Sequence, residues 1–181
     1  MALPQRRSVR LPGYDYRQAG AYYITLCTHN RAWIFGQITD DDMHLSRFGR
    51  IAEQEWLATP RIRSEVELDV FVIMPNHMHA VVLLGGVGRD GPRERAHGRA
   101  PLRRRGRSLG ALVAGFKSTV TKQINARRRT PGSPVWQRNY YDRVVRSRDE
   151  LDRIRKYVVG NPLSWTADKY NPANTPPDQN T

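Results

Sequence analysis

The segment VFVIMPNHMHAVVLL, from Val70 to Leu84, decides the architecture of this chain because it contains two adjacent β-strands. Apolar residues alternate with other residues from Val66 to Met74, which is typical of a strand with one buried face. The pair Pro75-Asn76 interrupts this pattern, and a second apolar strand runs from His77 to Leu84. The segment therefore predicts a tightly connected pair of strands with two histidines on the second one.

The flanking sequence predicts an α+β sandwich, in which helices pack mainly on one side of an antiparallel sheet. A third strand is expected over residues 22–30, a short hairpin over 33–46 and another strand over 140–146. Apolar residues at helical spacing predict helices that start at Arg47, after Ser108 and after Ser147. Pro162 ends the last of these helices.

The chain of 181 residues is expected to form one domain over residues 1–165. Residues 85–107, rich in glycine, proline and arginine, are interpreted as a flexible basic loop, and residues 166–181 as a loose polar tail. No stretch has the apolar length of a membrane-spanning helix, and no secretory signal opens the sequence. A single cysteine, Cys27, excludes a disulfide framework and a cysteine-rich zinc site. We expect a cytoplasmic, nucleoid-associated protein.

The charge points to a polyanionic partner. Lysine and arginine number 30 against 17 acidic residues, which gives a formal net charge of +13. Most of these cations are arginines, whose planar guanidinium suits bidentate contact with phosphate. Nucleic acid is the usual partner of such a protein. The alternative is a solvated surface in an organism whose proteins are generally rich in arginine.

His77 and His79 form a candidate metal site. Residues i and i+2 of a strand project from the same face, roughly 6–7 Å apart along the backbone, so both imidazoles can reach one divalent ion. The alternative is that both histidines decorate an exposed face of the strand. Two ligands leave a metal site incomplete, so at least one more must come from another part of the chain.

Tyr157 and Asn161 are candidates for a second part of this site. They stand four residues apart on the last predicted helix and therefore share one helical face. Leu151, Ile154 and Val158 form the neighbouring apolar stripe that would dock the helix on the sheet. Alternatively, Tyr157 is an amphipathic core tyrosine and Asn161 an ordinary residue at the end of a helix.

Three blocks of the sequence resemble the single-tyrosine transposases of the histidine–hydrophobic–histidine (HUH) group, specifically their REP-associated branch. These blocks are GAYYITLCTHNR, VFVIMPNHMHAVVLL and VWQRNYYDRVVRSRDELDRIRKYVVGNPLSW, and they occur in the family's order. The resemblance extends from about Tyr14 to Trp165. The His-Met-His triplet is a weak signal alone, but Tyr157 and the Asn161-Pro162 ending make the combination specific.

This resemblance implies a ferredoxin-like (RRM-like) sandwich with both histidines on a central strand. It also implies that Tyr157 is the nucleophile and that Asn161 helps His77 and His79 hold Mg²⁺ or Mn²⁺. Some members have glutamine where this chain has Asn161. Tyr140 and Tyr141 are rival nucleophiles that share no helical face with a third ligand. The implied reaction is cleavage and strand transfer of single-stranded DNA through a 5′-phosphotyrosine link.

The expected substrate is a single-stranded or hairpin DNA, bound by a monomer or a homodimer. Basic and aromatic side chains after residue 100 are the candidate DNA-binding residues, namely Arg103, Arg104, Arg105, Arg107, Lys117, Lys122, Arg127, Arg128, Trp136, Gln137 and Arg138. The helix cations could equally form a solvated face, and Trp136 could be part of the core.

Two other functions fit parts of the pattern. A non-catalytic nucleic-acid-binding module would keep the fold and the charge but would not need Tyr157. A metal-dependent phosphohydrolase acting on a small nucleotide would not need so positive a charge, and the chain lacks the further histidine of an HxHxH motif.

Overall fold

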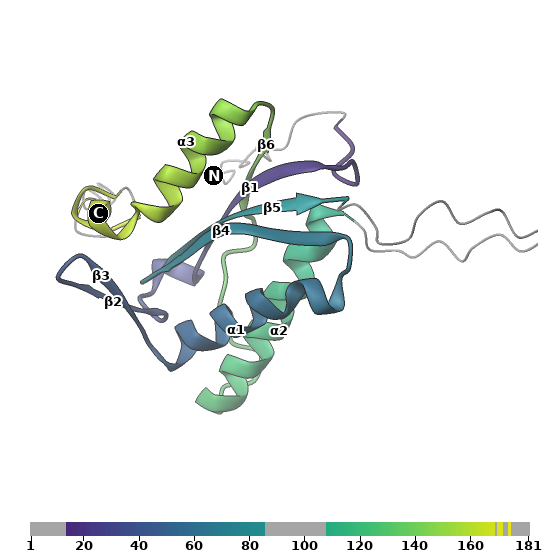
Figure 1. Cartoon of the computed structure of the whole chain (residues 1–181). Helices are drawn as coiled ribbons and strands as arrows, with labels where there is room; N and C mark the ends of the chain where they lie inside the picture. Colours follow the sequence, from purple (N-terminus) through teal and green to yellow (C-terminus); the bar gives the residue numbers. More distant parts are fainter. Residues whose placement is uncertain (1–13, 86–107, 169, 172–173, 175–181) are drawn as a thin grey trace, which may run out of the picture.

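A four-stranded antiparallel sheet with strand order β4-β5-β1-β6 forms the centre of the fold (Figure 1). The computed structural model describes residues 14–85, 108–168, 170, 171 and 174. The strands of this sheet are β1 (Gly20–Cys27), β4 (Val66–Met74), β5 (His77–Leu84) and β6 (Tyr141–Val145). The strand that carries the two histidines is therefore an interior one, paired on both sides.

Two helices cover one face of the sheet and the third lies on the other face, as Figure 1 shows. The helices and the small hairpin are α1 (Arg47–Ile62), α2 (Leu109–Arg128), α3 (Arg148–Val159), β2 (Gly36–Thr39) and β3 (Asp42–Leu45). Two short 3-10 helices are η1 (His29–Arg31) and η2 (Pro162–Ala167). The order β1-α1-β4-β5-α2-β6 is the ferredoxin-like arrangement, so the predicted fold class is confirmed.

The main core fills the space between the sheet and helices α1 and α2. Side chains of β5 alternate, so that Met78, Ala80, Val82 and Leu84 enter this core. The other face of β5 carries Val81 and both histidines, and it is covered by α3. The predicted division of this strand into an apolar face and a histidine face is thereby confirmed.

The predicted alternation of β4 is interrupted by a bulge between Leu68 and Phe71. Leu68 and Phe71 both pack on the main core, whereas Val70 and Val72 face α3. Simple alternation from Val66 to Met74 would place Leu68 and both of these valines on one face. An extra residue in one strand reverses the facing of every residue beyond it, which explains the difference.

Helix α3 docks through the predicted stripe. Val158 is fully buried against Tyr23 and Val81, and Leu151 and Ile154 pack beside it. The side chain of Ser147 caps the helix by accepting the N–H of Glu150 at 3.1 Å. Helix α3 therefore holds its C-terminal half over the face of the sheet that carries the histidines.

Helix α1 lies very close to the segment that enters β2. The side chain of Ser46 accepts the N–H groups of Phe48 and Gly49, which fixes the start of the helix. A methyl group at Gly49 would collide with the carbonyl oxygen of Phe35.

Within the described ranges, no helix is both long enough and apolar enough to cross a bilayer.

Candidate metal and tyrosine site

His77 and His79 project side by side from β5 and converge. Their Nε2 atoms lie 3.1 Å apart, and both side chains are at most 1% exposed. Two ligand atoms bound at right angles to one divalent ion, each with a bond of about 2.1 Å, would be about 3.0 Å apart. The separation of the two imidazole nitrogens therefore fits two neighbouring positions of one coordination sphere.

The ring of His77 is oriented by the residue before it. The Nδ1–H of His77 donates to Oδ1 of Asn76 at 2.8 Å, because the amide oxygen can only accept. This bond leaves Nε2 of neutral His77 with its lone pair directed at the space shared with His79. In a metal-binding histidine, the ring nitrogen that does not bind the metal typically donates such a hydrogen bond, which fixes the orientation of the ring.

The ring of His79 is held by two hydroxyl groups of the neighbouring strand β1. Its Nδ1 lies 2.8 Å from the hydroxyl oxygens of both Tyr23 and Thr25. Thr25 is the direct partner of His79 across the two strands. Burial raises the pKa of the Tyr23 phenol, so this hydroxyl stays protonated and neutral beside the imidazole.

Asp168 is the third member of the site. One carboxylate oxygen lies 4.0 Å from Nε2 of His77, and ligand atoms of His77, His79 and Asp168 all lie within 4.8 Å of one another. All three side chains are buried. A carboxylate beside two imidazoles is a ligand set that could hold Mn²⁺ or a similar divalent ion.

Asn161, the third ligand expected from the sequence, is also buried at 1% exposure. Neither amide atom makes a hydrogen bond within the described part of the chain. An unpaired buried amide costs about 1–3 kcal/mol, so such a group is normally satisfied by something. Its oxygen is thus available to a bound ion, although no hydrogen bond connects it to either histidine.

Tyr157 reaches the histidines from helix α3. Its hydroxyl oxygen lies 3.4 Å from Nε2 of His79, and the side chain is 46% exposed. Burial and then the negative charge of Asp168 raise the pKa of the phenol, while the nearby amide of Asn161 opposes this shift. Tyr157 is therefore protonated at neutral pH and lies between the ion-binding residues and the solvent.

A cavity of about 400 Å³ opens beside Tyr157. Tyr23, Tyr141 and Tyr170 line it together with the cations Arg143 and Arg153. Tyr141, one of the rival nucleophiles, therefore shares this cavity, whereas Tyr140 lies on the other side of β6 near Lys117. Glu150 also lines the cavity and forms an ion pair with Arg143, which leaves Arg153 as the cation not engaged in that pair.

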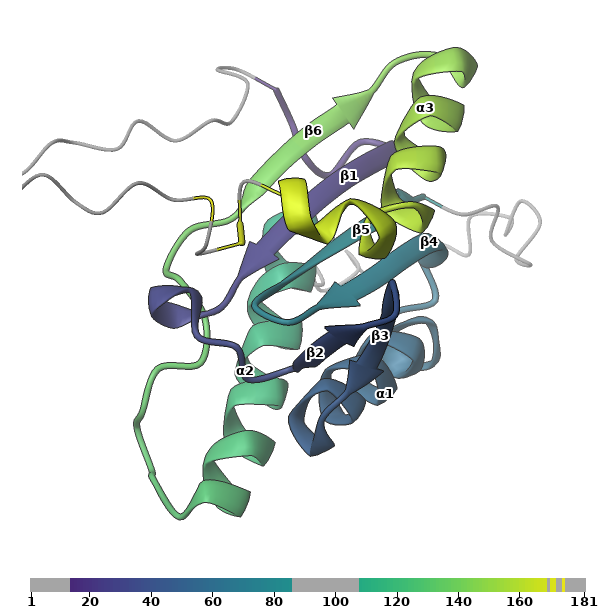
Figure 2. The ribbon, with the colours of Figure 1, turned by 90° about the vertical axis from the view of Figure 1, so that its left-hand side faces the viewer.

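The segment after α3 lies over the histidines, and its 3-10 helix η2 (Pro162–Ala167) extends across residue 166, where the tail was expected to begin. Figure 2 shows η2 lying across the face of β1 and β5. The ring of Tyr170 lies 4.6 Å from that of His77, and its carbonyl oxygen accepts the amide of Asn76 at 2.7 Å. The ring of Trp165 stacks on that of His77 with their centroids 6.1 Å apart. Hydrogen bonds to buried groups order these residues despite their polar composition.

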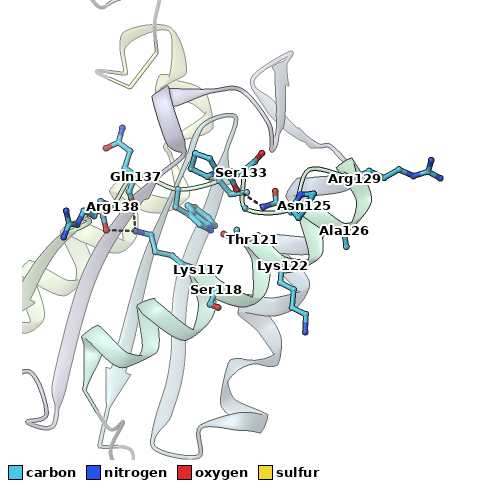
Figure 3. Close-up of a pocket in the computed structure, with 15 residues that line it drawn as sticks. Lys117, Ser118, Thr121, Lys122, Asn125, Ala126, Arg129, Ser133, Gln137 and Arg138 are labelled. Carbon is cyan, nitrogen blue, oxygen red and sulfur yellow. Dashed lines mark hydrogen bonds between the residues drawn. The ribbon is translucent and has the colours of Figure 1, made fainter.

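Five of the candidate DNA-binding residues gather in a separate groove between α2 and the following loop, namely Lys117, Lys122, Trp136, Gln137 and Arg138 (Figure 3). The ring of Trp136 is buried against Phe35 and Phe116, so it belongs to the core as well as to the floor of the groove. Arg127 and Arg128 do not line the groove, and Arg128 lies over the ring of Phe48. Arg103, Arg104, Arg105 and Arg107 lie outside the described residues.

Sequence reasoning missed several residues of the site. Tyr23 and Thr25 could have been found, because they share one face of β1 and that strand pairs with the histidine strand. Asn76 marks a break between strands in the sequence, but nothing local identifies it as the partner of His77. Asp168 gives no usable signal, because a single aspartate in a polar stretch has no periodicity that predicts burial.

No family model matches the chain. An uncharacterized protein of Haemophilus influenzae (strain ATCC 51907 / DSM 11121 / KW20 / Rd) is 35% identical over 167 residues, which cover 91% of this chain and 92% of that protein. The solved structure of a REP-associated tyrosine transposase bound to a REP hairpin superposes with a TM-score of 0.57 and 14% identity. That match covers 83% of this chain and 71% of the other.

A solved structure from Deinococcus radiodurans R1 aligns more loosely, with a TM-score of 0.40 at 15% identity over 84% of this chain and 96% of the other, and adds nothing to the fold assignment. The sequence resemblance to the REP-associated tyrosine transposases is thus confirmed at the level of the fold.

Proposed function

Because this chain belongs to one family with the Haemophilus influenzae protein and has the fold of a REP-associated tyrosine transposase, we propose that it cuts and rejoins single-stranded DNA with Tyr157 as the nucleophile. One observation carries the proposal: the Tyr157 hydroxyl lies 3.4 Å from Nε2 of His79, within the convergent group of buried metal-ligating side chains. A strand histidine pair and a helix tyrosine, predicted separately from sequence, meet at one point.

The proposed ligands of a divalent ion, Mg²⁺ or Mn²⁺, are His77, His79, Asp168 and the amide oxygen of Asn161. This set adds Asp168 to the three residues expected from the sequence. When bound, the ion would withdraw charge from the scissile phosphate and help orient it for attack. The mixture of imidazole, carboxylate and amide ligands suits Mn²⁺ well and is compatible with Mg²⁺.

Attack by the Tyr157 oxygen on phosphorus forms a tyrosine–phosphate bond and breaks the bond from phosphorus to the 3′ oxygen. The products are a 5′-phosphotyrosine and a free 3′-hydroxyl, which has taken up a proton. The phenol proton leaves to water, which reaches the half-exposed ring of Tyr157. Because the link keeps the phosphodiester energy, a 3′-hydroxyl can attack it in the reverse direction and rejoin a strand without ATP.

The neighbouring cavity supplies the means to hold the strand. Arg143 and Arg153 line it, and Arg143 is paired with Glu150, so Arg153 is the cation that we propose holds a phosphate near Tyr157. The aromatic rings of Tyr23, Tyr141 and Tyr170 offer apolar surface to a sugar or a base. The DNA bound to the solved REP-associated tyrosine transposase is a REP hairpin, and we propose a hairpin-forming strand as the substrate here.

The test is covalent capture. The protein is incubated with labelled hairpin DNA and either Mn²⁺ or Mg²⁺, then denatured and separated by gel electrophoresis. We expect a band in which DNA remains attached to protein, formed by the wild type and by Tyr141→Phe but not by Tyr157→Phe. An adduct that persists in Tyr157→Phe would contradict the assignment of the nucleophile.

The same assay separates the alternatives. A non-catalytic binding module would shift the hairpin in a native gel in all three proteins and form no adduct with any of them. Loss of the adduct on removing the metal with EDTA, and its return with Mn²⁺, would support the ligand group. Asp168→Ala and Asn161→Ala are then compared by the Mn²⁺ concentration that each needs to form the adduct. The residue whose loss raises this concentration is a ligand of the ion.

A further inference from the structure

A groove lies away from the tyrosine site, between α2 and the loop of residues 131–138 (Figure 3). Its volume is about 780 Å³. Its four cationic lining residues are Lys117, Lys122, Arg129 and Arg138, and no aspartate or glutamate is among the residues that line it. An anion is therefore the ligand that the charge of this groove favours.

The groove is formed before any ligand arrives. The side-chain amide of Asn125 donates to the carbonyl oxygen of Ser133 at 2.7 Å and fixes the start of the loop to α2. The amino group of Lys117 donates to the carbonyl oxygen of Gln137 at 2.6 Å and fixes its end. A binding site that is already ordered avoids the entropy loss of ordering a loop on binding.

Two polar atoms at the groove lack partners. Trp136 and Asn125 both line it and are more than nine-tenths buried. The indole N–H of Trp136 and the amide oxygen of Asn125 form no hydrogen bond with any described residue. Both atoms are enclosed by the protein, so a ligand would pair with them only if the loop shifted.

The groove is linked to the candidate active site through the sheet. The N–H of Gln137 donates to the carbonyl oxygen of Cys27 at 2.9 Å, and Cys27 is the partner of His77 across β1 and β5. Adjacent strand backbones lie about 4.8 Å apart, so Gln137 and His77 are separated by roughly 10 Å. Because α2 and the histidines lie on opposite faces of the sheet, a strand of nucleic acid that reached both places would pass around the end of the sheet.

We propose that this groove binds unpaired nucleotides of the DNA strand that flank the position cut by Tyr157. The proposal rests on the proposed function and adds to it a second contact region with a defined ligand. Bases would enter the apolar part of the groove, formed by Pro131, Pro134 and Val135 with Trp136 beneath them. Phosphates would lie along the rim beside Lys122, Arg129 and Arg138.

Paired DNA does not fit this arrangement as well. In a duplex the bases are stacked and only their groove edges are accessible, whereas an unpaired base can turn its face and its full edge toward the protein. A groove that offers apolar surface and a cationic rim therefore favours the unpaired part of a hairpin substrate over its stem.

The test compares two labelled hairpins with the same stem, one blunt and one with ten thymidines added at each end. Affinity is measured by fluorescence anisotropy in EDTA, so that no cleavage contributes. For the wild type we expect the extensions to tighten binding about 10-fold. In Thr121→Trp, which fills the groove from α2, this gain should disappear while the affinity for the blunt hairpin is unchanged.

The matched control is Thr119→Trp, the same substitution on the same helix at an exposed position that does not line the groove. Thr119→Trp should keep the full gain in affinity that the thymidine extensions give to the wild type. Ala126→Trp, at an exposed position that does line the groove, serves as a second blocking variant if Thr121→Trp is poorly folded.

The proposal is overturned if the extensions give no gain in the wild type, or if the gain survives in both blocking variants. Displacement of the extended hairpin by a poly-glutamate peptide of equal charge at equal concentration would also overturn it, since the groove would then select charge alone. The adduct assay reports on Tyr157 separately, so failure of this binding test would leave the proposed function standing.

Discussion

Asn76 shows how much of the candidate site depends on one side chain that performs no chemistry. Its amide oxygen accepts Nδ1–H of His77, and its amide nitrogen donates to the carbonyl oxygens of Arg31 and Tyr170. The first bond orients a proposed metal ligand, the bond to Tyr170 attaches the covering segment to the start of β5, and the bond to Arg31 attaches η1 to the same place. This fully buried residue thus couples the ring of His77 to the closure of the site.

We predict that Asn76→Ala weakens Mn²⁺ binding about 10- to 100-fold, because removal of the partner that orients a ligating histidine has an effect of this size. Isothermal titration calorimetry with Mn²⁺ measures it. Asn139→Ala, at an exposed asparagine away from the histidines, is the control and should bind as the wild type does. An unchanged Kd in a folded Asn76→Ala protein would contradict the role assigned to this amide.

Gly49 carries a prediction about stability. A methyl group there meets the carbonyl oxygen of Phe35, so Gly49→Ala should lower the free energy of unfolding by about 1–3 kcal/mol or more, as overpacking does. Gly115→Ala is a matched control, since a methyl group at that position of α2 meets no atom within 4 Å. It should stabilise the protein by about 0.4–1 kcal/mol through helix propensity. Urea unfolding of both variants measures the change in the free energy of unfolding, which should be negative for Gly49→Ala and positive for Gly115→Ala.

At the scale of elements, α3 spans the whole sheet and is fastened at both edge strands. On β6, Arg143 forms an ion pair with Glu150 at 2.6 Å. On β4, Arg155 holds Asp69 through Nε at 3.0 Å and through a second nitrogen at 2.5 Å. The β4 bulge lies at Asp69, so the irregularity in the strand coincides with the anchor of the helix that carries Tyr157.

The Arg155–Asp69 pair predicts a pH dependence of stability. The Arg155 guanidinium holds the pKa of Asp69 below its ordinary value of 3.8. A carboxyl whose folded-state pKa is depressed contributes stability above its unfolded pKa and loses it as the pH falls through the folded value. Asp69→Asn should therefore be less stable than the wild type at neutral pH, by on the order of 1 kcal/mol because Arg155 is partly solvated.

Urea unfolding at pH 7 and at several values below pH 4 measures this difference, which should shrink over the acid range. Asp152→Asn is the control, because Asp152 also contacts Arg155 but is half-exposed. A deficit in Asp69→Asn that stays constant down to acid unfolding would show that charge is not its cause.

The elements themselves could be predicted from periodicity, but their registers and closures could not. Alternation in the Val70–Leu84 segment and the caps at Ser108 and Ser147 locate strands and helices well, because these signals are local. A bulge such as that at Asp69 leaves no local mark, since either register keeps valines in apolar surroundings. Asp168 is similar, because its burial depends on how η2 folds back over the sheet and not on its neighbours in sequence.

For the whole molecule, the excess of 13 positive charges predicts DNA binding that weakens steeply with salt. Each phosphate contact with single-stranded DNA contributes a slope of about −0.7 in log K against log salt. The double variant Lys122→Gln with Arg138→Gln should therefore reduce the magnitude of the slope by about 1.4. Anisotropy titrations with an extended hairpin from about 50 to 300 mM NaCl, on the order of physiological salt, measure it.

Arg61→Gln is the control for this titration, because Arg61 is an exposed cation on α1 that lines neither the groove nor the cavity beside Tyr157. Its slope should match that of the wild type. A double variant with an unchanged slope would show that Lys122 and Arg138 do not contact phosphate.

The origin of the site in distant parts of the chain has a consequence for how the protein behaves before it is fully folded. His79 and Tyr157 are 78 positions apart, and the hydroxyl groups beside His79 come from β1, more than 50 positions before it. Contacts between such distant segments form only once the sheet is complete and α3 has docked. A nascent or partly unfolded copy already carries the positive charge, but its histidines and Tyr157 are not yet brought together. The proposed strand cleavage would therefore be confined to molecules that have finished folding.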